Sequence, residues 1–247
     1  SKLQVWIGHG LASFGVPVLD LSLEMGRDLR WDWYVSRHLG LDSSVIGTQA
    51  MPRPDVEALL AASHPVYGLS LTIDDRPSRT LRDVGLAVQE WRAGTSGPGV
   101  VLLDYLQLMH LERERGESEA TALARTARGL AVEARRSGCA WVVTAQLNRG
   151  AEEDEPGPQH LEGSGGIAQA AAGMLLLDNL VRRGRAIDTG PRTTPIRWRV
   201  VQRAGRAGSG SCVVDLTTGT WRASEPGDEG IFRAPFRRGA LDQDGLA

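Results

Sequence analysis

A carboxylate follows an apolar segment at a point where many enzymes place a ligand. Residues 100–103 read Val-Val-Leu-Leu, and Asp104 comes directly after them. A continuous apolar run of this kind is typical of a strand that is covered on both faces of a parallel sheet. Ligands bind at the carboxyl edge of such sheets, and an Asp at the strand end can hold Mg²⁺ there. The alternative is a strand that ends in an ordinary turn Asp, and the bare pattern by itself favours that alternative.

Strand and helix patterns alternate around this segment and predict an α/β domain with a mainly parallel sheet. Thr80 can cap the start of one of the expected helices. A first helix begins at once, and its expected buried face carries apolar residues at helical spacing. That face comprises Leu3, Trp6, Ile7, Gly10, Leu11 and Phe14. The other expected helices cover residues 28–39, 54–62, 80–91 and 117–136, and the strands cover 17–22, 69–73, 100–103 and 140–145.

The last third of the chain has a different pattern. Residues 150–166 form a long loop with an acidic run, and residues 174–177 are strand-like. Ile196, Trp198 and Val200 alternate with arginines, which is the period of a half-exposed strand. Residues 212–216 are its expected partner in a carboxyl-terminal β-hairpin. We expect one domain over residues 1–222 and a polar, flexible tail over 223–247.

The composition excludes several classes of protein. The chain has 28 Lys and Arg against 30 Asp and Glu, so its formal net charge of −2 gives no general attraction for nucleic acid. The two cysteines, Cys139 and Cys212, lie in apolar runs and are expected to be buried thiols. We find no zinc-ligand spacing, no signal peptide and no apolar run of the roughly 20 residues that a membrane helix needs. A cytoplasmic protein is expected.

Five segments in order resemble the motifs of DnaB-type replicative DNA helicases. Residues 104–109, Asp-Tyr-Leu-Gln-Leu-Met, are similar to the Walker B segment of that family, and Ser22-Leu23-Glu24-Met25 to its strand-end motif with the catalytic glutamate. Residues 73–80 are similar to the next strand and turn, and residues 145–149 to the sensor strand. Residues 202–205 resemble the segment that carries the arginine finger. The resemblance covers residues 1–221 and implies a RecA-like P-loop NTPase core.

The resemblance implies a role for each matched residue. Asp104 would hold Mg²⁺, and Ser1 would be the Mg²⁺ ligand that follows a Gly-rich phosphate loop, which we expect to precede the chain. Glu24 would be the general base toward the attacking water, and Gln146 would sense the γ-phosphate of ATP. Arg203 would reach the nucleotide of a neighbouring subunit as an arginine finger. Glu24 and Arg203 could each be a surface residue, and Gln146 could be structural.

The resemblance also implies partners. These are ATP and Mg²⁺, single-stranded DNA, further copies of the chain in a ring that is expected to be hexameric, and a primase or a helicase loader. Backbone amides of Gly163, Ser164 and Gly165 would meet DNA phosphates in a loop that is only a weak match to the family.

Two departures from the family pattern weaken the predicted DNA loop and the predicted arginine-finger segment. Glu162 stands where the family has a phosphate-contacting Arg, and Val201 stands where its finger segment has Lys. One alternative is therefore a degenerate, non-hydrolysing homologue with an assembly or regulatory role. Another is a RecA-like ATPase of recombination or plasmid replication, against which the segment that begins at Asp104 argues.

Overall fold

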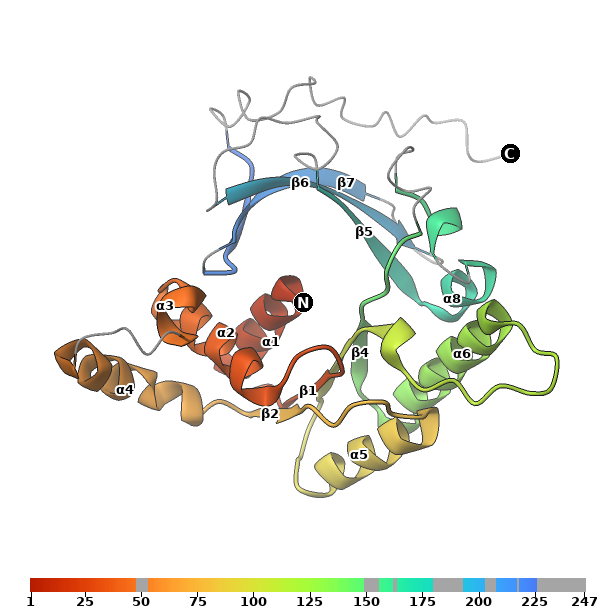
Figure 1. Cartoon of the computed structure of the whole chain (residues 1–247), viewed down its shortest axis with the longest axis horizontal. Helices are drawn as coiled ribbons and strands as arrows, with labels where there is room; N and C mark the ends of the chain where they lie inside the picture. Colours follow the sequence, from red (N-terminus) through yellow and green to blue (C-terminus); the bar gives the residue numbers. More distant parts are fainter. Residues whose placement is uncertain are drawn as a thin grey trace.

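Two four-stranded sheets organise the chain (Figure 1). They are seen in a computed structural model, which describes residues 1–47, 53–148, 156–161, 164–179, 193–202, 208–216 and 218–225. The first sheet is parallel throughout, with the strand order β2-β1-β3-β4. Its strands are β1 (Val18–Ser22), β2 (Leu71–Asp74), β3 (Val100–Asp104) and β4 (Ala140–Val143). The predicted α/β architecture is confirmed.

Helices cover both faces of the parallel sheet. Alternate side chains of a strand point to opposite faces. Leu19 and Leu21 of β1 and Leu103 of β3 share a core cluster with residues of the helices at 81–93 and 119–137, whereas Val18 and Leu102 lie in a second cluster with the helix at 2–13. One set of helices comprises α1 (Lys2–Ser13), α2 (Arg27–Leu39), α3 (Ser43–Gly47) and α4 (Arg53–Tyr67), and the other α5 (Leu81–Ala93) and α6 (Glu119–Ser137). Figure 1 shows the two sets on either side of the sheet.

Local signals in the sequence set several helix ends. The Thr80 hydroxyl accepts a hydrogen bond from the Asp83 amide while the Asp83 carboxylate accepts from the Thr80 amide, which forms a complete capping box. Gly138 ends α6 and Gly40 follows α2, both in the left-handed conformation that glycine adopts without strain. The boundaries of α5 and α6 therefore lie within two residues of their predicted positions.

The predicted apolar face of α1 is confirmed only in part, because Ile7 and Leu11 pack against the core but are not fully buried. The residues that the structure buries are Gln4, Val5, Gly8 and Ala12, whereas Phe14 is 90% exposed. The helix turns this narrower face to the sheet because Gly8 and Ala12 allow a close approach, and Gln4 hydrogen-bonds to backbone carbonyls of the strands. A pattern of large apolar residues could not show this in full, since small and polar residues make part of the contact.

The second sheet is antiparallel and larger than the predicted hairpin. Its strands are β5 (Gly173–Asn179), β6 (Thr193–Gln202), β7 (Gly208–Asp215) and β8 (Trp221–Ala223), in that order. The predicted pairing of β6 with β7 is confirmed, with Ile196 opposite Cys212. Both cysteines are buried free thiols, as expected. The predicted flexible tail lies almost wholly outside the described residues, which end at 225.

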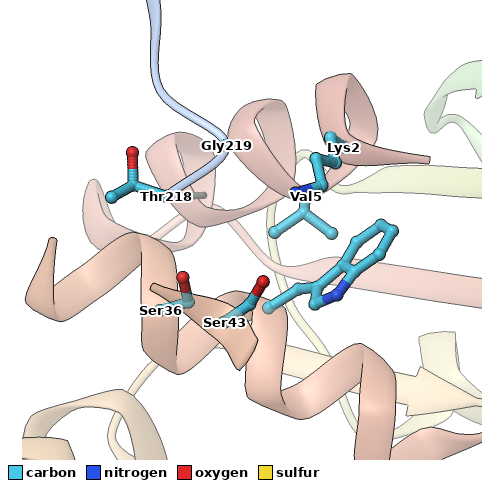
Figure 2. Close-up of a pocket in the computed structure, with 7 residues that line it drawn as sticks. Lys2, Val5, Ser36, Ser43, Thr218 and Gly219 are labelled. Carbon is cyan, nitrogen blue, oxygen red and sulfur yellow. The ribbon is translucent and has the colours of Figure 1, made fainter. Parts of the chain in front are cut away.

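The turn between β7 and β8 contacts the helices of the first sheet. Thr218 and Gly219 line a small pocket together with Lys2 and Val5 of α1 (Figure 2). The Arg37 guanidinium of α2 donates a hydrogen bond of 3.5 Å to the Thr220 hydroxyl. The antiparallel sheet is therefore anchored beside the amino end of α1. No described helix is both long and apolar enough to span a bilayer.

Candidate active site

The carboxyl ends of β1 and β3 bring three of the predicted site residues together. The strands pair in parallel with Ser22 opposite Asp104, and the Leu23 amide donates to the Asp104 carbonyl at 2.9 Å. The Ser1 hydroxyl donates a hydrogen bond of 3.1 Å to Oε2 of Glu24. The amino nitrogen of Ser1 lies 3.8 Å from Oδ2 of Asp104. Ser1, Glu24 and Asp104 thus form one cluster, although 103 positions separate its ends in the sequence.

Asp104 is held at both carboxylate oxygens. The Thr144 hydroxyl donates to Oδ1 at 2.8 Å, and Nη1 of Arg30 donates to Oδ2 at 2.9 Å. Burial alone would raise the pKa of Asp104, but the positive charge of the Arg30 guanidinium and the hydrogen bond from the Thr144 hydroxyl act to lower that pKa. The carboxylate is therefore ionised and fixed in direction at neutral pH. Sequence reasoning found Asp104 but missed both Thr144 and Arg30.

A buried ionic network lies directly behind Asp104. Arg30 donates from Nε to Oδ2 of Asp20 at 2.8 Å and from Nη2 to Oδ1 at 3.0 Å, so the pair is bidentate. The Tyr34 hydroxyl donates to the same Asp20 at 2.7 Å. Nη2 of Arg30 also donates to the Gln4 side chain at 3.2 Å. All four side chains belong to residues with 0% exposure.

The charges of this network stabilise one another. Burial alone would lower the pKa of the Arg30 guanidinium, but the carboxylate of Asp20 and its hydrogen bonds hold that pKa above the ordinary value. Burial, followed by the negative charge of Asp20, raises the pKa of Tyr34. One sequence signal could have revealed the network, because Asp20 interrupts an apolar strand ten residues before Arg30.

Gln146 lies at the same edge of the sheet but outside the cluster. The side chain of Gln107 makes two hydrogen bonds to the backbone of Gln146. It donates to the Gln146 carbonyl at 3.2 Å and accepts from the Gln146 amide at 3.1 Å. The Gln146 side chain is exposed. Within the described part of the chain, no hydrogen bond joins that side chain to Ser1, Glu24 or Asp104. Gln107 was also missed by sequence reasoning.

The structure changes the description of the predicted DNA loop. Ser164 and Gly165 belong to a short helix, α8 (Ser164–Ala170), rather than to a loop. The helix packs so closely on α6 that a Cβ at Gly166 would lie 2.2 Å from the Cβ of Ala124. Gly163 and Arg203 lie outside the described residues.

The cluster fits a hard divalent cation that is shared with a ligand. Mg²⁺ prefers oxygen donors and usually takes only one or two from the protein, with water and phosphate completing its coordination. Ser1 offers a hydroxyl and Asp104 a carboxylate. No group of three His, Cys, Asp or Glu side chains that could hold a metal occurs among the described residues. The first turn of α1 carries no acidic side chain, which suits a phosphate at the positive end of the helix.

The sequence matches the profile of the DnaB-like helicase C terminal domain over residues 4–209. The chain belongs to this family. The motifs that resemble DnaB-type helicases therefore lie in the matched domain, and the parallel sheet is its RecA-like core.

Individual relatives agree with the DnaB family assignment. The replicative DNA helicase DnaB of Synechocystis sp. is 30% identical over 138 residues, which are 56% of this chain and 16% of that protein. A solved DnaB-like replicative helicase, described with its interactions with primase, has a TM-score of 0.80 at 18% identity. The alignment covers 91% of this chain and 54% of the solved chain. The solved ATPase domain of G40P has a TM-score of 0.81 at 18% identity, with 91% and 80% covered. At this identity the two structures show the shared fold.

Proposed function

We propose that this DnaB-family domain is the ATP-hydrolysing motor of a replicative DNA helicase. The observation that carries the proposal is the convergence of Ser1, Glu24 and Asp104 at the carboxyl edge of the parallel sheet. Open α/β sheets bind their ligands at this edge, and the family profile covers the strands that form it. Translocation on single-stranded DNA and unwinding at a replication fork are parts of the same proposal.

Each residue of the cluster has a chemical task. Ser1 and Asp104 would hold Mg²⁺, which supplies charge neutralisation between the phosphates of ATP when it is bound. Glu24 is exposed at the strand end and would accept the proton of the attacking water. Its hydrogen bond from Ser1 keeps the carboxylate turned toward the cluster. Gln146 would report the state of the γ-phosphate, and Arg203 would stabilise charge in a neighbouring subunit's site.

The partners are inferred from the family. A ring of copies, expected to be hexameric, follows from the trans role of Arg203. Gly163, Ser164 and Gly165 would approach single-stranded DNA beside α8, and primase is a partner named for one solved relative. A non-hydrolysing homologue with a regulatory role is the second candidate, because Glu162 and Val201 replace basic residues of the family pattern.

Two substitutions in the full-length protein test the motor function. Glu24→Gln keeps the shape of the side chain but cannot take a proton, so turnover of ATP should fall by about 10²–10⁴-fold while nucleotide binding remains. Asp104→Asn should instead weaken Mg²⁺-dependent nucleotide binding. Glu90→Gln is a matched control, since Glu90 is an exposed glutamate on α5. Turnover within about threefold of wild type in Glu24→Gln would refute the general-base role.

The outcome for the wild-type protein separates the two candidate functions. A motor binds ATP and hydrolyses it with a dependence on Mg²⁺. A non-hydrolysing homologue with a regulatory role shows no turnover that Glu24→Gln could remove. A protein that binds no nucleotide at all would exclude the motor and favour the non-hydrolysing homologue.

Mixed rings test the role of Arg203. Subunits with Arg203→Ala keep a complete nucleotide site, whereas subunits with Glu24→Gln keep a complete finger. Some interfaces of a mixed ring combine the two intact parts, so ATPase activity should partly return. If mixed rings form and no activity returns, Arg203 does not act across a subunit interface.

A further inference from the structure

Arg30 bridges two carboxylates from neighbouring strands, and only one of them is needed to pair its charge. Its Nε and Nη2 bind Asp20 of β1, and its Nη1 binds Asp104 of β3. Asp20 is opposite Leu102 and Ser22 is opposite Asp104, so the two aspartates lie two register steps apart on the same face of the sheet. Arg30 is on α2, the first helix after Glu24. A single guanidinium therefore links the helix to both strands of the candidate site.

The link restricts how the Asp104 carboxylate can move. Nη1 of Arg30 holds Oδ2 at 2.9 Å, and the hydroxyl of Thr144 on the opposite side holds Oδ1 at 2.8 Å. A carboxylate with both oxygens held cannot rotate about its last bond without breaking a charge-assisted hydrogen bond. A lone pair remains on each oxygen for a further contact, so a cation would meet a carboxylate whose orientation is already fixed.

The link also changes the charge that Asp104 presents. The Arg30 guanidinium is 0% exposed and the Asp104 side chain is 2% exposed, so water screens their interaction very little. The positive charge of Arg30 opposes the approach of any second cation. The negative charge of Asp20 compensates Arg30 only in part at the position of Asp104, because Asp20 contacts the far side of the guanidinium.

We propose that Arg30 is a positioning residue for Asp104, which fixes the direction of its carboxylate and lowers the affinity of the site for Mg²⁺. The inference rests on the proposed function, since it takes Asp104 as a Mg²⁺ ligand. A purely structural ion pair would hold α2 on the sheet and contribute to folding, but it would not change the dependence of nucleotide binding on Mg²⁺.

Two variants of the full-length protein should shift that dependence in opposite directions. Asp20→Asn removes a negative charge and leaves Arg30 paired with Asp104 alone, so the Mg²⁺ concentration for half-maximal nucleotide binding should rise by at least about threefold. The double variant Asp20→Leu with Arg30→Met replaces the ion pair by apolar groups of similar size. Other proteins tolerate the replacement of a buried ion pair by apolar residues of similar volume. In this double variant the Mg²⁺ concentration for half-maximal nucleotide binding should fall by at least about threefold.

The readout is binding of a fluorescent, non-hydrolysable ATP analogue titrated with Mg²⁺, which requires no turnover. Circular dichroism and thermal unfolding show whether each variant is folded. Tyr34→Phe is the matched control, because it removes a hydrogen bond to Asp20 and leaves every charge in place. Its half-saturating Mg²⁺ concentration should stay within about twofold of wild type.

Opposite shifts in the two variants support the inference. Shifts in the same direction, or none, overturn it and leave Arg30 a structural residue. If the double variant does not fold, Asp20→Asn decides alone, since an unchanged or lower half-saturating concentration contradicts the role of the Arg30 charge. A wild-type protein whose nucleotide binding ignores Mg²⁺ overturns both this inference and the proposed function.

Discussion

Gly8 of α1 is the position where adding a single methyl group should disturb the candidate site most. A Cβ built on Gly8 would lie 2.5 Å from the Tyr34 hydroxyl oxygen and 2.8 Å from Cδ1 of Leu102. Tyr34 is fully buried, and its hydroxyl donates to Asp20. The new methyl group therefore cannot be accommodated without moving a side chain of the ionic network.

The size of the effect follows from two opposing contributions. Alanine is favoured over glycine inside a helix by about 1 kcal/mol. Overpacking a buried contact costs about 1–3 kcal/mol, and a displaced hydrogen bond to a charged group costs about 1.5–3 kcal/mol. Gly8→Ala should lower the free energy of unfolding by about 1.5–5 kcal/mol overall.

Gly10 provides the control within the same helix. A Cβ at Gly10 would meet no atom within 4 Å, so Gly10→Ala keeps the gain in helix propensity without any collision. Urea unfolding of the two variants and the wild-type protein gives the comparison, provided that the denaturant slopes agree. Gly10→Ala should be more stable than wild type and Gly8→Ala less stable. Equal stability of the two variants would show that α1 does not approach Tyr34 as closely as the structure has it.

Substitutions at three further positions have expected outcomes. Burial, and to a smaller extent the positive charge of Arg37, lowers the pKa of His9 to about 4. The unfolded chain therefore binds the proton more readily than the folded chain, and the free energy of unfolding should fall as the pH drops from about 6.5 toward 4. His9→Gln should reduce that fall. Burial alone would raise the pKa of Asp74, but hydrogen bonds from two arginines of the following turn lower it to about 2. The stability that Asp74 contributes should be complete above pH 4 and lost toward pH 2, and Asp74→Asn should remove this pH dependence in urea unfolding at matched pH values. Thr80→Ala should lower the free energy of unfolding by about 1 kcal/mol, because it removes the hydroxyl that caps α5. Thr80→Ser keeps that hydroxyl and should change the free energy of unfolding little. Equal losses in the two variants would contradict the capping role.

The sequence by itself determined the class of fold and much of its framework. Alternating apolar runs and helical periods predicted the four parallel strands, because covered strands and amphipathic helices leave patterns that are local in the chain. Glycines and a capping Thr fixed several helix ends for the same reason. The order of motifs around Asp104 indicated the DnaB family, to which the family profile assigns the chain.

Only the tertiary structure decided which side chains meet behind these motifs. The sequence predicted that α1 buries its large apolar residues, but the folded helix turns Gly8 and Ala12 inward. Four strands rather than two form the antiparallel sheet, since pairing between distant segments leaves no local signal. Asp20 and Arg30 are charged residues at buried positions of β1 and α2. Their burial is tolerated because the fold brings Arg30 within hydrogen-bonding distance of both Asp20 and Asp104.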